Sequence, residues 1–169
     1  MNFNLEGDWA RFLKKYIDME GVLYVDPAWQ VPMRVAYPTQ TLSEIRKMPV
    51  KHVFKRGICY LWVIESLLDE GIRIMREWGF EYKATNVWVK TDEDHHVQDF
   101  MGRWFLHPYE HCLIGVKGKV DDLAAPFKNN AQSALIVEPK PALNSQKPPI
   151  MYSLIKEHWR APFCLELYA

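Results

Sequence analysis

A short apolar run that ends in an acid and a proline constrains the fold of this chain most strongly. Val22, Leu23 and Val25 are apolar and mostly β-branched, and the run stops at Asp26. Pro27 has no amide hydrogen and disfavours helical geometry at the residue before it, so a strand must end there. A buried strand that delivers a carboxylate at its carboxyl end is typical of ligand sites in α/β proteins. We therefore expect a strand whose end forms part of a site.

The residues after this strand indicate what such a site binds. Trp29 places a large flat ring within a few residues of Asp26. A carboxylate, the carbonyl groups of a turn and an aromatic face together suit a flat heterocycle that carries an amino group. The same stretch is equally compatible with an ordinary strand end that has a surface aspartate and a core tryptophan.

Length and composition limit the other possibilities. A chain of 169 residues is expected to form one domain with a sizeable core. Lys and Arg together number 21, as do Asp and Glu, so a bound polyanion would need a local patch or a partner to attract it. Cys59, Cys112 and Cys164 lie in apolar runs without Cys-x-x-Cys spacing, which predicts reduced core residues of an intracellular protein. We expect neither a secretory leader nor a membrane span.

Hydrophobic patterning predicts alternating strands and helices. Strands are expected at 21–26, 58–64, 81–90, 110–117, 134–137 and 163–168, and helices at 8–18, between Thr41 and Pro49, between Ser66 and Trp78, and at 150–158. Such alternation favours an open, mostly parallel sheet. The strand at 134–137 is expected to be buried, and residues 91–103 to form a mobile loop.

Three helices carry more detailed signals. Thr41 and Glu44 have the spacing of a capping box, and Ser66 with Asp69 is expected to cap the next helix. Each of the two longer helices is predicted to bury one apolar stripe: Leu68, Ile72 and Met75 in one, and Ile150, Leu154 and Ile155 in the other.

The segment 102–111 concentrates rings and ionisable groups just before a strand. His107, Glu110 and His111 raise the possibility of a metal site. Pro108 breaks the helix that a His-x-x-x-His site needs, so we predict no metal. The chain also lacks a Gly-x-Gly-x-x-Gly motif, which argues against a common dehydrogenase.

The order of several motifs resembles the N6-adenine methyltransferase family with the Asp-Pro-Pro-Trp signature. The matching segments are 26–29, 37–39, 61–63, 78–80, 87–91, 102–104, 110–118, 147–148 and 165–168. The resemblance implies a Rossmann-like methyltransferase fold, an α/β architecture in which helices cover both faces of a mostly parallel twisted sheet. It implies a methyltransferase domain over 21–169, preceded by a helical lead-in over 1–20.

The resemblance also implies roles for individual residues, with S-adenosylmethionine as the cofactor and no metal. Asp26 and the Pro27 carbonyl would accept the hydrogens of the adenine amine, so that its nitrogen attacks the methyl group on the cofactor. The implied sets are catalytic Asp26, Pro27, Ala28 and Trp29; substrate-binding Tyr37, Trp104, His107 and Glu110; and cofactor-binding Asp26, Lys147, Glu166 and Tyr168. Trp29 and Tyr37 would flank the unstacked base.

Two departures from the family pattern leave two hypotheses open. Ala28 stands where the family has a second proline, and the family's cofactor clamp follows Tyr168 in a segment that this sequence does not include. The first hypothesis is a nuclear methyltransferase subunit that acts on adenine in RNA or DNA. The alternative is an inactive methyltransferase-like subunit that supports an active paralogue. Both predict a heteromeric partner and no membrane association.

Overall fold

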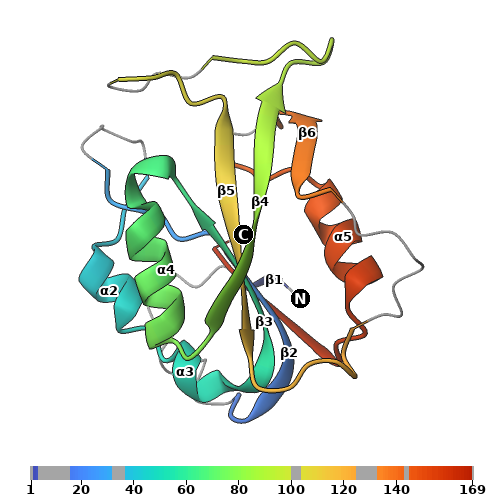
Figure 1. Ribbon diagram of the computed structural model, residues 1–169. Coiled ribbons are helices and arrows are strands. Elements are labelled where there is room, and N and C mark those ends of the chain that lie inside the picture. The colour runs from blue at the N-terminus through green and yellow to red at the C-terminus, as the bar shows by residue number, and fades with distance from the viewer. Residues whose placement is uncertain are drawn as a thin grey trace.

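The computed structural model describes residues 2–3, 16–31, 37–99, 104–124, 133–142 and 145–168. Its centre is a seven-stranded twisted sheet in the order β1-β7-β2-β3-β5-β4-β6 (Figure 1). The strands are β1 (Asn2–Phe3), β2 (Met19–Val25), β3 (Phe54–Val63), β4 (Glu81–Thr91), β5 (Tyr109–Lys117), β6 (Leu135–Pro139) and β7 (Phe163–Leu167).

The sheet is mostly parallel, as the sequence predicts. The neighbours β1 and β7, β7 and β2, β2 and β3, and β4 and β6 all run parallel. Only β5 is antiparallel to its neighbours β3 and β4. β2 approaches both β3 and β7 closely at Gly21, which pairs with Gly57 on one side and Phe163 on the other. This order brings the carboxyl end of β2 beside the carboxyl end of β3 and the start of β5.

Helices cover both faces of the sheet, which confirms the predicted Rossmann-like arrangement. The helices α2 (Leu42–Arg46), α3 (Val50–Val53) and α4 (Leu68–Glu77) lie on one side, and α5 (Ile150–His158) lies on the other (Figure 1). Alternate residues of β2 separate accordingly: Leu23 and Val25 join the core under α2–α4, whereas Val22 and Tyr24 join the core under α5.

The helix signals of the sequence were right in part. Thr41 and Glu44 form the predicted capping box at the start of α2. The predicted cap at Ser66 was wrong, because a 3₁₀ turn over Glu65–Leu67 leads directly into α4. The predicted inward stripes were right except at Ile150, which is 38% exposed. The other five predicted residues are buried or pack against the core: Leu68, Ile72, Met75, Leu154 and Ile155. The prediction omitted Ile74 in α4 and Met151 in α5, which are fully buried.

Three further expectations differ from the structure. β6 is an edge strand rather than a buried one: Ile136 is buried, but Leu135 and Val137 are about half exposed. Cys59 and Cys112 are buried as predicted, whereas Cys164 is exposed. Within the expected helical lead-in, residues 2–3 form a strand, and most of the helix predicted at 8–18 lies outside the described residues. No helix in the described part of the chain has both the length and the apolar character needed to cross a bilayer.

Candidate active site

The site begins at the turn that follows β2. The Asp26 amide donates to the carbonyl of Leu167 at 3.3 Å, the last contact between β2 and β7. Pro27 then ends the ladder, and its carbonyl accepts the Trp29 amide at 2.8 Å. Gln40 closes the loop by donating its amide to the Ala28 carbonyl at 2.7 Å. The turn at Ala28 is thus closed by backbone hydrogen bonds.

Asp26 belongs to a chain of alternating charges across the sheet. The Lys147 ammonium lies 2.8 Å from an Asp26 carboxylate oxygen and 3.1 Å from one of Glu110. Glu110 also binds the ammonium of Lys90. All four side chains are largely buried, with exposed fractions of 19% for Asp26, 11% for Lys147, 17% for Glu110 and 12% for Lys90. We call these four residues the charge network.

Burial and pairing shift the pKa values of the network in different directions. Burial raises the pKa of Asp26 to about 6, and the nearby Lys147 only partly opposes this shift. Burial also disfavours the charged form of Glu110, but Lys147 and Lys90 outweigh it and lower its pKa. For Lys147, burial is outweighed by the two carboxylates, so its pKa is raised and the ammonium persists. Among Asp26, Glu110 and Lys147, Asp26 is therefore the group whose protonation changes nearest to neutral pH.

Two tryptophan rings form the floor beneath these charges. The Lys147 ammonium lies 5.4 Å from the centroid of the Trp62 ring, and the Lys90 ammonium lies 5.1 Å from that of Trp88. The two rings meet edge to face, with centroids 6.1 Å apart. The Trp62 indole nitrogen donates to the Tyr24 hydroxyl at 2.8 Å, which fixes the ring.

Sequence reasoning did not include Lys90, Trp62 and Trp88 in the site. Strand register offered a signal, since Trp88 pairs with Glu110 across β4 and β5 and Lys90 shares its face. That signal depends on knowing that β5 lies between β3 and β4, which the sequence alone does not show.

Comparison with known proteins decides the family. The MT-A70 family model matches residues 21–169. The chain belongs to the MT-A70 family. An N(6)-adenosine-methyltransferase MT-A70-like protein of Arabidopsis thaliana is 28% identical over 151 residues, which cover 88% of this chain and 21% of the relative. The family resemblance seen in the sequence motifs is thereby confirmed.

Relatives in the MT-A70 family include both kinds of subunit. The human N(6)-adenosine-methyltransferase catalytic subunit METTL3 is 28% identical over 84% of this chain and 25% of its own length. The Xenopus tropicalis non-catalytic subunit METTL14 is 29% identical over 74% of this chain and 28% of its own length. The chain thus spans only about a quarter of the length of these relatives.

In this MT-A70 domain the predicted catalytic residue Trp29 is a core residue. Its side chain is 7% exposed, and its indole nitrogen donates to the backbone carbonyl of Trp62 at 3.0 Å. The ring packs under α2–α4, and this position does not support the predicted stacking on a base. Through this hydrogen bond Trp29 instead holds the turn after β2 against the end of β3.

Tyr37 and Glu110 lie close to Lys147. Glu110 binds Lys147 directly, as described above, and the Tyr37 hydroxyl accepts a hydrogen bond from Ser145 at 3.2 Å. The backbone carbonyl of Ser145 in turn accepts from the Lys147 ammonium at 3.3 Å. Tyr37 is 46% exposed, so part of its ring faces solvent beside the charge network.

The other two residues of the predicted substrate set lie before and at the start of β5. Trp104 is 81% exposed. His107 contacts Tyr109, with its Nδ1 atom 3.4 Å from the tyrosine hydroxyl. The contact between His107 and Tyr109 lies outside the charge network.

The predicted cofactor-binding residues at the end of the chain separate to opposite faces. Glu166 is 6% exposed, pairs in register with Tyr24, and accepts a hydrogen bond from the Tyr152 hydroxyl of α5 at 2.6 Å. It therefore lies on the same face as the charge network. Tyr168 adopts a positive φ of 63° and packs on the α2–α4 side, where its hydroxyl contacts Gln40 and the Met48 sulfur.

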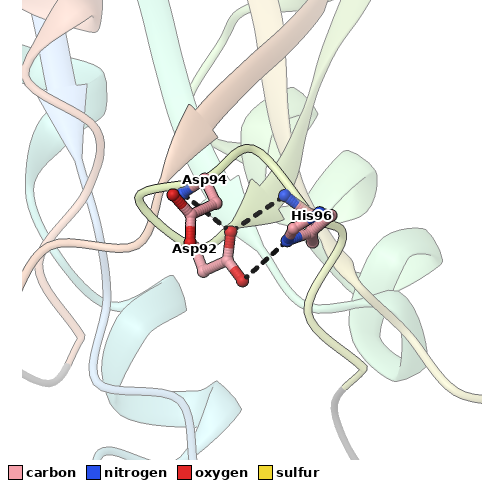
Figure 2. Close-up of side chains that lie close together, drawn as sticks. All are labelled: Asp92, Asp94 and His96. Carbon is pink, nitrogen blue, oxygen red and sulfur yellow. Dashed lines mark hydrogen bonds and ion pairs between the residues drawn. The ribbon is translucent and has the colours of Figure 1, made fainter.

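A second cluster of ionisable groups lies in the loop after β4. Asp92, Asp94 and His96 place one ligand atom each within 4.8 Å of the others (Figure 2). One Asp92 oxygen already accepts the amides of Asp94 and His96, at 3.0 and 2.9 Å. These bonds also lower the pKa of Asp92. The cluster is explained by a carboxylate that orders its own loop.

Proposed function

We propose that this MT-A70 domain transfers a methyl group from S-adenosylmethionine to N6 of adenine in RNA or DNA. The observation that carries the proposal is Asp26, a largely buried carboxylate at a closed strand-end turn, held by Lys147 at 2.8 Å. The names of the relatives support the same reaction class, since both the Arabidopsis and the human proteins are N(6)-adenosine-methyltransferases.

The residues of this chain suit an amine nucleophile. In the proposed reaction the adenine amine donates one hydrogen bond to the Asp26 carboxylate and another to the Pro27 carbonyl. When the nitrogen gains the methyl group it would release one proton, for which the Asp26 carboxylate is the acceptor. The Pro27 carbonyl already accepts from the Trp29 amide, but a carbonyl oxygen has a second lone pair to offer. Two acceptors fix the orientation of the nitrogen, and positioning of this kind lowers a barrier without a nucleophilic side chain.

The residues present also fit the cofactor. S-adenosylmethionine supplies the electrophilic methyl group when it is bound. Glu166 offers a buried carboxylate that already accepts a hydroxyl hydrogen from Tyr152, which is the chemistry that ribose hydroxyls require. Asp26 and Lys147 lie on the same face and would border the reacting end, whereas Tyr168 would contribute through the turn that it forms after β7.

The test is a direct assay of the product. Purified protein, with any partner that copurifies, is incubated with S-adenosylmethionine labelled in its methyl group and with RNA or DNA oligonucleotides. Mass spectrometry of the nucleosides is expected to show N6-methyladenine for one of the two nucleic acids. Absence of product from both, in a preparation that binds the cofactor, would refute the proposed activity.

A non-catalytic role is the second candidate, because METTL14 of Xenopus tropicalis is named a non-catalytic subunit and is 29% identical over 74% of this chain, against 28% over 84% for METTL3. Ala28 at the turn favours this role. Calorimetry with S-adenosylmethionine distinguishes the two candidates: an active subunit is expected to bind the cofactor, and a scaffold subunit is expected not to.

We further propose that the protein acts in a heteromeric complex in the nucleus. Exposed apolar residues support a partner, among them Trp104, Phe105 and Leu106 before β5, with exposed fractions of 81%, 77% and 53%. Monomeric proteins rarely expose large apolar side chains in succession. Imaging of the tagged protein in its own cells tests the nuclear location.

A further inference from the structure

Ser145 has a backbone conformation that its side chain disfavours. Its φ of 67° lies in the left-handed region, where glycine and asparagine are common and serine is not. Strained residues of this kind persist where the surrounding structure holds them, and they concentrate at functional sites. A serine at such a position is explained if its hydroxyl group makes a hydrogen bond that the site needs.

The two polar groups of Ser145 reach two different parts of the site. Its hydroxyl donates to the Tyr37 hydroxyl at 3.2 Å, and its backbone carbonyl accepts from the Lys147 ammonium at 3.3 Å. Tyr37 follows the turn that carries Asp26, whereas Lys147 precedes α5. Ser145 therefore joins two segments that are far apart in the sequence.

Lys147 makes this link relevant to Asp26. An ammonium has three hydrogens, and here its acceptors are Asp26 at 2.8 Å, Glu110 at 3.1 Å and the Ser145 carbonyl at 3.3 Å. The ammonium is thus satisfied on three sides by groups from three separate segments. The left-handed turn at Ser145 is what aims its carbonyl at Lys147 while its hydroxyl points to Tyr37.

We infer that Ser145 is a positioning residue that ties Tyr37 to the Lys147–Asp26 pair and thereby sets where the acceptor base lies. The inference rests on the proposed methyl transfer. Tyr37 is half exposed and offers a ring for the base, and the hydroxyl bridge holds that ring at a fixed place relative to the carboxylate. Loss of the bridge should weaken binding of the acceptor more than binding of the cofactor.

Three variants separate the hydroxyl from the backbone. Ser145→Gly removes the hydroxyl and relaxes the left-handed backbone, Tyr37→Phe removes the other end of the bridge, and Ser145→Asn keeps both a left-handed preference and a side-chain donor. The first two are expected to raise KM for an adenine-containing oligonucleotide about two- to tenfold, as the loss of one hydrogen bond predicts. Affinity for S-adenosylmethionine should remain within about twofold, and Ser145→Asn should restore much of the loss.

Coupling between the two residues gives the sharper result. The double variant Ser145→Gly with Tyr37→Phe is expected to have a KM no higher than the worse single variant, because both changes remove the same bond. Additive effects in the double variant, or an unchanged KM in Ser145→Gly, would overturn the inference.

Hydrogen exchange tests the hydrogen bond between Ser145 and Tyr37 without an activity assay. In the longest natural form of the protein, Ser145→Gly should speed amide exchange around Tyr37, and Tyr37→Phe should speed exchange between Ser145 and Tyr152. This reciprocal change is expected even if the protein methylates nothing, so a failed assay and a failed bridge are distinguishable. Exchange that rises only around the substituted residue would overturn the inference.

Discussion

Asp26 differs from the other members of the charge network in what its removal leaves behind. When Asp26 is replaced by alanine, Lys147 still has Glu110 and the Ser145 carbonyl as acceptors. The raised pKa of Asp26 also shows that the fold does not favour its ionised form. We therefore predict that Asp26→Ala abolishes methyl transfer but lowers stability by less than about 1 kcal/mol.

Parallel measurements of product formation and thermal unfolding check this prediction. Asp26→Asn is the finer variant, because its amide keeps one acceptor but loses the charge, and it is expected to retain at most a trace of activity. Turnover at the wild-type rate in Asp26→Ala, with the same partner present, would contradict the catalytic role.

The pKa of Asp26 predicts how activity depends on pH. Since burial raises this pKa to about 6, the carboxylate that accepts the amine hydrogen is lost as the pH falls through that value. We expect the rate to decline below about pH 6. Lys147→Met should move this decline to higher pH, because Lys147 opposes the upward shift.

Rates measured between pH 5 and 9 with saturating substrates provide the test, with His95→Gln in the exposed loop after β4 as a control that should leave the profile unchanged. A decline at the same pH in the Lys147→Met variant would show that another group is responsible.

At the scale of single elements, the pairing of β2 with its neighbours depends on two glycines. A Cβ atom at Gly21 would lie 2.0 Å from the Phe163 carbonyl oxygen, and one at Gly57 would lie 2.2 Å from that of Gly21. Backbone cannot move aside as a flexible side chain can. Gly21→Ala is predicted to cost about 2–4 kcal/mol of stability, measured by urea unfolding.

Gly71→Ala in α4 is the matched control. The three atoms nearest to its new Cβ atom are side-chain atoms of Leu113 and Val63, at 3.1 to 3.4 Å, and alanine favours a helix. Its stability should change by less than about 1 kcal/mol. Equal losses in Gly21→Ala and Gly71→Ala would contradict the backbone explanation.

The elements that the sequence predicted well are those with local causes. The end of β2 follows from Pro27, and the start of α2 follows from the capping box at Thr41. The edge position of β6 was missed, because it depends on which strands become neighbours. Leu135 looks buried in the sequence but is about half exposed on β6, the outermost strand of the sheet in the described residues.

The site was predictable to a similar extent. Asp26 was identified from a local strand end, whereas its pairing with Lys147 requires the fold. Lys90 and Trp62 were missed for the same reason, since β5 must lie antiparallel between β3 and β4 to bring them to Glu110 and Asp26. All the roles carried over from the family remain predictions, including those of Trp104, His107 and Tyr168.

At the scale of the whole molecule, the exposed residues before β5 predict a partner. Trp104→Ser combined with Phe105→Ser should weaken a heteromeric complex by at least about tenfold, since large aromatic residues dominate interface energies. Pull-down followed by sedimentation of the copurified complex measures this.

Ile17→Ser is the control, because Ile17 is also apolar and 64% exposed but precedes β2. A wild-type chain that sediments as a stable monomer and binds nucleic acid unaided would contradict the need for a partner.

Asp26 and Lys147 lie far apart in the sequence, and this separation affects when the pair forms during synthesis and folding. Along this chain the carboxylate is synthesised before β3, whereas the ammonium follows β6. Contacts between distant segments form late in folding, because closing the intervening chain costs entropy first. A chain that is incomplete or only partly folded therefore has Asp26 without Lys147 beside it. We expect the proposed methyl transfer to become possible only in the last cooperative step of folding.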